Sequence, residues 1–293
     1  MKICVAFGGV RFHFDSDCDI MVDDAIAPFF CAPADVPHVS IRLIHDFSTA
    51  PLPRSPMLGE DLLMEFYRED NGLLCMSKSS LGQYLASCLC SDDMRQITCW
   101  LNFSPGMPVD RLASILRMIP MRRILLEHGV LFLHASQISL DGTGILFTAP
   151  SGTGKTTQAR LWNRFRNARI ICNDRTLTDC TNTYGYPYDG SEPVCCSEQH
   201  DLGAVVVLRQ APENTIRRLR PREALALLMS QTVLDVWDGD ARSAAAERTL
   251  DLIGNTPVYL LACTPDESAV RCLEQQLMKD GVIPNEKDPG PHS

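Results

Sequence analysis

Short apolar or alternating runs, separated by turn-forming residues, fill the first third of the chain. Pro, Asp, Asn and Gly stand between the runs, and these residues favour turns over regular structure. The pattern predicts strands at 3–7, 38–44, 62–67, 73–76 and 97–103. We therefore expect a strand-rich N-terminal domain over residues 1–107.

The apolar period changes to that of a helix between residues 109 and 128. Apolar residues recur at the i, i+3, i+4, i+7 spacing of one helical face, and Asp110 can cap the start. Pro120 interrupts the run, so a kinked helix or two helices are expected. We interpret residues 108–129 as a helical connector.

Strands and helices alternate from residue 130 onward, which favours an α/β (α+β) domain over 130–278. Strands are expected at 131–133, 145–148, 169–172, 202–208, 215–219 and 258–263, and helices up to 165 and over 221–231 and 265–278. The strongly apolar run 202–208 suits the centre of a sheet, with 215–219 as its edge neighbour. Residues 279–293 are rich in Pro, Gly and charge and predict a flexible tail.

Composition and charge exclude several classes of protein. The 293 residues carry 27 Lys and Arg against 36 Asp and Glu, a net charge of −9. An acidic chain lacks the basic surface of a general nucleic-acid-binding protein. No apolar run reaches the roughly 18 residues of a membrane-spanning helix, and the first ten residues lack the apolar core of a secretory signal.

The chain has thirteen scattered cysteines and no Cys-x-x-Cys pair, so the usual zinc-ribbon and thioredoxin spacings are absent. Many of them lie in apolar runs, and with no export signal we expect a reduced, cytoplasmic protein, with zinc binding as the alternative. Five aspartates lie between residues 15 and 24. They lack the Gly and the distal Glu of an EF-hand, so they predict a solvated turn.

The most informative segment for function follows the predicted strand 145–148. It matches the phosphate-loop pattern G-x-x-x-x-G-K-[ST], except that Ala149 replaces the first Gly. Glycines let successive N–H groups approach phosphate oxygens at the N-terminus of the next helix. A lysine adds a charge for the β- and γ-phosphates, and a threonine hydroxyl can bind Mg²⁺. We expect ATP and Mg²⁺ to bind at Ser151, Gly152, Thr153, Gly154, Lys155, Thr156 and Thr157.

A second chemical signal lies nineteen residues beyond Lys155, where the predicted strand 169–172 ends in Asn173 and Asp174. A carboxylate beside a phosphate loop can hold Mg²⁺ or take a proton from an attacking hydroxyl. A capping Asp in a turn is the alternative, and the neighbouring loop favours the functional interpretation.

These residues together resemble the HPr kinase and PEP carboxykinase superfamily. Its pattern is a His-Gly/Ala strand, a Ser-Gly-x-Gly-Lys-Ser/Thr loop and an Asp-Asp strand end. The matching segments here are His134-Ala-Ser136, Ser151-Gly-Thr-Gly-Lys-Thr156 and Asn173-Asp174. Residues 154–162 and 228–233 look similar to HPr kinase-like proteins often labelled PEP carboxykinase-like and sometimes found near peptide-modification genes. The resemblance covers about 130–275 and implies a P-loop kinase domain with a mixed sheet.

The resemblance also implies roles for single residues. Lys155 and Thr156 would bind phosphate and metal, His134 would lie beside the transferring phosphate, and Asp174 would be the general base and a metal ligand. A structural histidine is the alternative for His134.

Arg175 departs from the family, which has a second Asp there. An arginine about 4 Å from Mg²⁺ would cost about 8 kcal/mol at an effective dielectric near 20. Either one metal suffices and Arg175 contacts phosphate, or strand alternation turns it away.

Three further residues complete the candidate contacts with substrate, metal or phosphate, beside Asn173. Asp189 and Glu192 lie in a turn-rich stretch that either contacts metal or acceptor or is a solvated turn. Arg209, at the end of the strand 202–208, is a candidate phosphate contact.

We predict a kinase that moves the γ-phosphate of ATP to a hydroxyl, either of a Ser in a peptide or protein or of a small alcohol. One alternative is a PEP carboxykinase-like lyase, which the short chain and the lack of an evident metal-binding cluster disfavour. The other is a non-catalytic ATP-binding sensor or scaffold in peptide modification. Family kinases often assemble as oligomers, so a homo-oligomer is expected by analogy.

Overall fold

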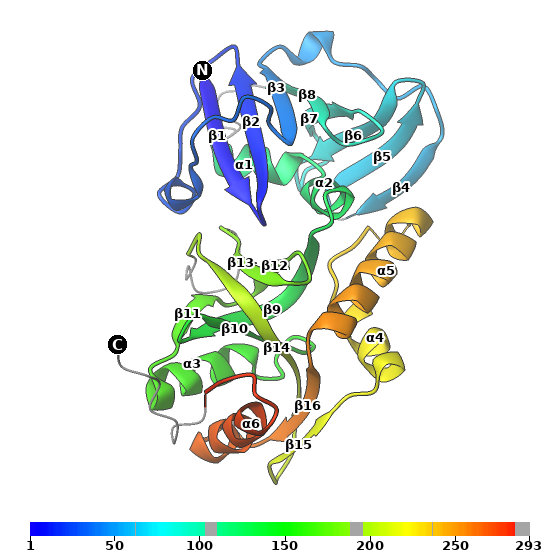
Figure 1. Cartoon of the computed structure of the whole chain (residues 1–293). Coiled ribbons are helices and arrows are strands. Elements are labelled where there is room, and N and C mark those ends of the chain that lie inside the picture. Colours follow the sequence, from blue (N-terminus) through cyan, green and yellow to red (C-terminus); the bar gives the residue numbers. More distant parts are fainter. Residues whose placement is uncertain (62, 103–109, 188–195, 236, 285–293) are drawn as a thin grey trace. The chain divides into compact units, whose positions relative to one another are not determined.

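The computed structural model describes residues 1–61, 63–102, 110–187, 196–235 and 237–284 (Figure 1). The chain divides into two compact units. The first contains residues 1–129 and 234–244, and the second contains residues 130–233 and 245–293. The expected connector therefore belongs to the first unit, together with a short segment from late in the sequence.

One mixed sheet forms the first unit, with the strand order β1-β2-β3-β8-β7-β6-β5-β4. Its strands are β1 (Lys2–Phe7), β2 (Val10–Ser16), β3 (Val39–Ile44), β4 (Met57–Asp61), β5 (Met64–Glu69), β6 (Gly72–Lys78), β7 (Tyr84–Cys90) and β8 (Gln96–Leu101). The 3-10 turns η1 (Ala27–Phe29) and η2 (Phe47–Thr49) lie in its connections. The five predicted strands are found. The strands β4 and β7 were missed because polar or small residues interrupt their apolar pattern, and β2 was missed although its apolar and polar residues alternate regularly.

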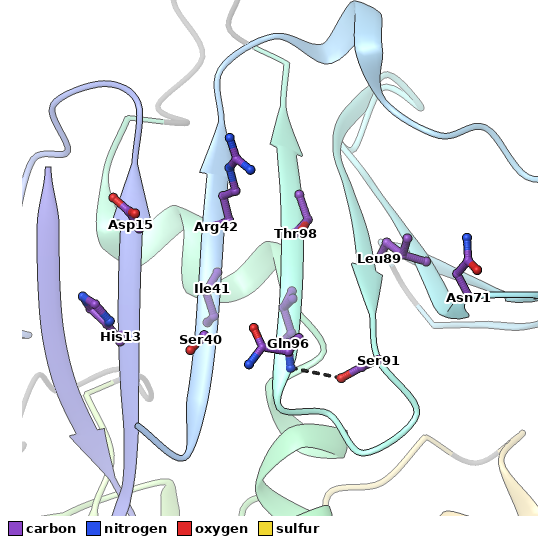
Figure 2. Close-up of a pocket in the computed structure, with 11 residues that line it drawn as sticks. His13, Asp15, Ser40, Ile41, Arg42, Asn71, Leu89, Ser91, Gln96 and Thr98 are labelled. Carbon is purple, nitrogen blue, oxygen red and sulfur yellow. Dashed lines mark hydrogen bonds between the residues drawn. The ribbon is translucent and has the colours of Figure 1, made fainter. Parts of the chain in front are cut away.

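Strand alternation gives this sheet one apolar and one polar face. Phe12, Phe14 and Ile97 are buried, while the residues next to them in each strand point to the other side of the sheet. Figure 2 shows that polar face, where a hollow of about 460 Å³ spans β2, β3, β8 and β7. His13 and Arg42 lie in it.

Two short helices cover part of the apolar face. They are α1 (Leu112–Met118) and α2 (Met121–Glu127), separated at Pro120 as the sequence predicted. The thiol of Cys88 on β7 donates to the carbonyl of Met118 over 3.4 Å, so α1 lies against the sheet.

The expected cap of this helical region is wrong. Arg111, not Asp110, is the N-cap residue of α1, and its side chain makes no capping bond. Asp23 supplies the cap from 90 residues away, because its Oδ2 accepts a hydrogen bond from the Ala113 N–H at 3.2 Å. Its Oδ1 pairs with Arg111 at 3.1 Å. One of the five clustered aspartates therefore has a structural role.

Asp23→Ala is expected to lower the free energy of unfolding by about 1 kcal/mol, the usual cost of a lost N-cap. Asp23→Asn keeps an acceptor oxygen and should lose less. Equilibrium urea denaturation measures both variants, and an alanine variant as stable as the wild type would contradict the assigned cap.

The second unit contains a mixed sheet with the order β10-β9-β12-β13-β14-β16-β15, with β11 paired to β9. Its strands are β9 (Leu131–Leu140), β10 (Thr143–Thr148), β11 (Arg169–Cys172), β12 (Arg175–Thr178), β13 (Asn182–Gly185), β14 (Gln199–Gln210), β15 (Thr215–Arg218) and β16 (Val258–Cys263). The strands β10, β14 and β16 run parallel. Their carboxyl ends therefore meet at one edge of the sheet, where α/β proteins bind ligands.

Helices pack on this sheet around an apolar core. They are α3 (Lys155–Arg166), α4 (Pro221–Met229), α5 (Gly239–Asn255), which starts in the segment 234–244, and α6 (Glu267–Lys279). Trp162 of α3 and Leu273 of α6 are fully buried in one cluster with Phe147, Val206 and Leu261 of the strands. None of the described helices has the length and apolar character needed to cross a membrane.

Two expectations for this unit need correction. The strand β15 lies at the edge as predicted, but it pairs with β16, not with β14, because β16 occupies the place between them. The predicted tail 279–293 is packed over its first residues. The chain turns at Gly281, whose φ is +71°, and Ile283 is 6% exposed in the core. Residues 285–293 lie outside the described residues.

Four buried free thiols lie on strands of the first sheet. Cys75, Cys88, Cys90 and Cys99 are fully buried in the first sheet, where a reduced thiol packs like a small apolar side chain.

Candidate functional site

A glycine loop, residues 149–154, connects β10 to α3. Gly152 has a φ of +77° and Gly154 a φ of +116°. Both lie in the left-handed region that glycine adopts without strain. Gly154 is the N-cap residue of α3 and provides no side-chain cap. The first N–H groups of α3 therefore lack a capping side chain, which suits an anion.

Lys155, the first residue of α3, folds back over the glycine loop. Its Nζ donates to the Ala149 carbonyl at 2.9 Å and to the Pro150 carbonyl at 3.4 Å, and the residue is 7% exposed. Burial lowers the pKa of Lys155, and the nearby negative charge of Asp174 acts against this shift. The ammonium group thus contacts the loop carbonyls.

The structure brings His134 and Asp174 together although 40 residues separate them. His134 Nε2 lies 3.0 Å from Asp174 Oδ1. His134 lies on β9. Asp174 is bonded to the same strand, because the Ala135 N–H donates to the Asp174 carbonyl at 3.0 Å. The Thr148 hydroxyl at the end of β10 donates to the His134 carbonyl at 2.9 Å. The pair therefore lies beside the strand that leads into the glycine loop.

Arg175 lies next to this pair. It is directly opposite His134 in the ladder of β12 and β9, so both side chains point to the same face of the sheet. Its Nε is 3.8 Å from Asp174 Oδ2, and its guanidinium carbon is 5.8 Å from the centre of the Phe132 ring. Strand alternation does not turn Arg175 away from Asp174.

The remaining candidate residues for contact with substrate or phosphate lie in different surroundings. Asn173 is 5% exposed, and its side-chain amide makes no hydrogen bond to any described residue. Arg209 is exposed on β14 between Leu208 and Gln210, and alternation directs it to the opposite face from these two residues. Asp189 and Glu192 lie outside the described residues.

A cavity of about 350 Å³ opens beside the glycine loop at the carboxyl ends of β14 and β16. Its walls are formed by Gly152, Thr153, Gly154, Thr157, Gln158, Leu208, Gln210, Ala211, Cys263, Thr264 and Pro265. The strand-end residues of this wall and Gln158 were not predicted from the sequence. The position of Gln158, three residues after Lys155 and hence on the next turn of α3, was an available signal.

The oxygen donors near the loop fit a magnesium ion. Mg²⁺ prefers oxygen ligands and is usually held by one or two carboxylates together with substrate phosphates and water. The Asp174 carboxylate and the Thr156 hydroxyl are donors of this kind. The described residues contain one group of three potential metal ligands within 4.8 Å of one another, Asp17, Cys18 and His45, and it lies in the first unit.

Comparisons with known proteins give a family and distant similarities to solved structures. The model of a family described as SynChlorMet cassette protein ScmC matches residues 98–277, which include the glycine loop and Asp174. The HPr(Ser) kinase/phosphatase from Coxiella burnetii is similar over 51% of this chain and 98% of its own, with 13% identity and a TM-score of 0.29. No curated protein matches the sequence.

Proposed function

This chain belongs to the ScmC family of SynChlorMet cassette proteins, and we propose that its second unit is an ATP-dependent phosphotransferase. In this proposal ATP binds with Mg²⁺ at residues 151–157, and its γ-phosphate passes to a hydroxyl. The acceptor is a Ser of a peptide or protein, or a small alcohol.

One observation carries the proposal: a carboxylate paired with a histidine lies beside the strand that leads into a glycine loop with a buried lysine. Asp174 Oδ1 is 3.0 Å from His134 Nε2, and the His134 carbonyl accepts a hydrogen bond from Thr148 at the end of β10. An anion-binding loop alone serves many functions, but a base beside it suits transfer to a hydroxyl. This combination favours a kinase over a simple nucleotide sensor.

Each residue has a role in the proposed reaction. The loop N–H groups hold the phosphates, and Lys155 exchanges the carbonyls of Ala149 and Pro150 for phosphate oxygens. Asp174 accepts the proton of the attacking hydroxyl, and His134 orients its carboxylate. Thr156 and Asp174 would hold Mg²⁺, which supplies neutralisation of phosphate charge when bound.

Arg175 supports a reaction with one metal ion. Its guanidinium lies 3.8 Å from Asp174 Oδ2, so one Mg²⁺ would have to bind on the side of the carboxylate away from Arg175, and a second divalent ion beside the guanidinium would meet like charge. We propose that Arg175 contacts a transferring phosphate oxygen, as an arginine supplied in cis does in other phosphoryl-transfer enzymes.

The test is a transfer screen with labelled ATP against peptides and small alcohols, with and without Mg²⁺. We expect Mg²⁺-dependent ATP consumption by the wild type and none by Lys155→Ala. Equal ATP consumption by the two proteins would overturn the proposal. If neither protein consumes ATP, the non-catalytic sensor is the function that stands. A parallel reaction with oxaloacetate and ATP should give no phosphoenolpyruvate, whereas its formation would establish the lyase.

A further inference from the structure

The cavity beside the glycine loop contains a buried polar side chain with an incomplete set of hydrogen bonds. Gln158 is 2% exposed, and its Nε2 donates to the Cys263 thiol at 3.4 Å. Its Oε1 has no hydrogen-bond partner among the described residues. Buried carbonyl oxygens in proteins nearly always have a partner. A ligand donor in the cavity would complete this one.

The walls of the cavity indicate an uncharged ligand group. The side chains that line it are apolar, hydroxyl, thiol or amide groups, and no charged side chain is among the described lining residues. Apolar walls with a few converging polar groups are typical of small-molecule sites. Charged phosphates suit the loop N–H groups and Lys155, so the cavity suits the neutral remainder of the same molecule.

The cavity wall is also tied to the phosphate-binding end. Gln210 Nε2 donates to the carbonyls of Gly152 and Thr153 at 3.3 and 3.4 Å. These hydrogen bonds join the cavity wall to the glycine loop, so one ligand that spans both would contact residues that are bonded to each other.

We infer that the nucleoside of the phosphate donor occupies this cavity and donates a hydrogen bond to Gln158 Oε1. The donor is either the amino group of adenine or a ribose hydroxyl, both of which supply the hydrogen that Oε1 lacks. Gln158 is then a specificity-determining residue for the donor nucleotide. The inference rests on the proposed function and adds the location of the nucleoside.

The first experiment compares calorimetric binding of Mg²⁺-ATP and Mg²⁺-tripolyphosphate, which lacks a nucleoside. Gln158→Leu should weaken ATP binding about threefold to tenfold, the effect of one lost hydrogen bond, and change tripolyphosphate binding less than about twofold. The control, Gln276→Leu on α6, makes the same replacement outside the cavity and should change neither. Equal effects of Gln158→Leu on both ligands, or no effect on either, would overturn the inference.

Two further nucleotides identify the hydrogen-bond donor. Inosine triphosphate has a carbonyl oxygen in place of the adenine amine, and 2′-deoxyATP lacks one ribose hydroxyl. The analogue that lacks the donor should bind equally to the wild type and to Gln158→Leu. If both analogues lose affinity in the variant as ATP does, the 3′ hydroxyl is the donor, and 3′-deoxyATP should bind the two proteins equally. Loss of affinity for 3′-deoxyATP as well would overturn the hydrogen bond to Gln158.

A second measurement uses only the wild type and is independent of the fold of a variant. Cys263 is partly exposed in the cavity wall, and Cys18 is exposed in the first unit. Mg²⁺-ATP should slow alkylation of Cys263 by iodoacetamide, as read by peptide mass spectrometry, whereas tripolyphosphate should not. The rate at Cys18 should stay constant.

The two proposals fail in different ways. If neither ATP nor tripolyphosphate binds, the proposed function is wrong. If both bind but ATP leaves the alkylation of Cys263 unchanged, only the placement of the nucleoside is wrong.

Discussion

Asp174→Asn is expected to reduce phosphoryl transfer at least about 100-fold, because general-base catalysis typically contributes 10²–10⁴-fold. Asparagine has nearly the same shape and can still contact His134, but it cannot accept the proton of the acceptor hydroxyl. Binding of Mg²⁺-ATP should stay within about tenfold of the wild type, since the loop N–H groups and Lys155 remain. Initial transfer rates and calorimetric titration measure the two effects separately.

The matched control for this variant is Asp251→Asn. Asp251 is exposed on α5 and makes a surface ion pair with Arg248, so the same replacement there should leave transfer unchanged. Undiminished transfer by Asp174→Asn would remove Asp174 as the base. An equal loss of ATP binding would assign it to nucleotide binding instead.

Arg122→Leu is expected to lower the free energy of unfolding by about 3–5 kcal/mol, the usual cost of leaving one partner of a buried ion pair uncompensated. Arg122 Nη2 is 2.8 Å from Asp235 Oδ1, and Arg122 also pairs with Asp61. Asp235 is 5% exposed. The variant therefore leaves a carboxylate buried without its cation. Equilibrium urea denaturation measures the loss.

The pH dependence of this loss tests its cause. Burial raises the pKa of Asp235, and Arg122 acts against that shift. A carboxyl group with a higher pKa in the folded state binds more protons when folded. Its contribution to stability therefore falls as the pH rises above 3.8, the ordinary pKa of an aspartate. Without Arg122 the pKa rises further, and the deficit of the variant should therefore shrink as pH falls.

The double variant Arg122→Leu/Asp235→Leu should recover most of the lost stability, because it removes both charges. The control Arg95→Leu breaks an exposed contact of 3.9 Å with Asp93 and should change stability little. A deficit that persists unchanged in the double variant would contradict the assigned ion pair.

Local sequence patterns predicted the elements whose structure is determined by residues adjacent in the sequence. The glycine loop followed from a contiguous motif between an apolar strand and a helix, and the separation of α1 from α2 followed from Pro120. The closeness of His134 and Asp174 depends on the register of β9 with its neighbours. It was expected only from resemblance to a family.

Features that depend on strand order were missed. The cavity beside Gln158 exists because β16 lies next to β14, whereas the sequence suggested β15 as the neighbour. The segment 234–244 joins the first unit through contacts such as Arg122 with Asp235, which no local pattern reveals. The helix α5 was missed because its alanine-rich sequence has few large apolar residues.

A nucleotide site at the glycine loop is tested most directly by calorimetric titration of Mg²⁺-ATP into the wild type, Lys155→Ala and the control Lys279→Ala. We predict binding to the wild type and to the control, and affinity about tenfold to a hundredfold lower for Lys155→Ala, the effect of a lost charge-assisted hydrogen bond. Equal affinity of all three proteins, or no binding to the wild type, would contradict a nucleotide site at the glycine loop.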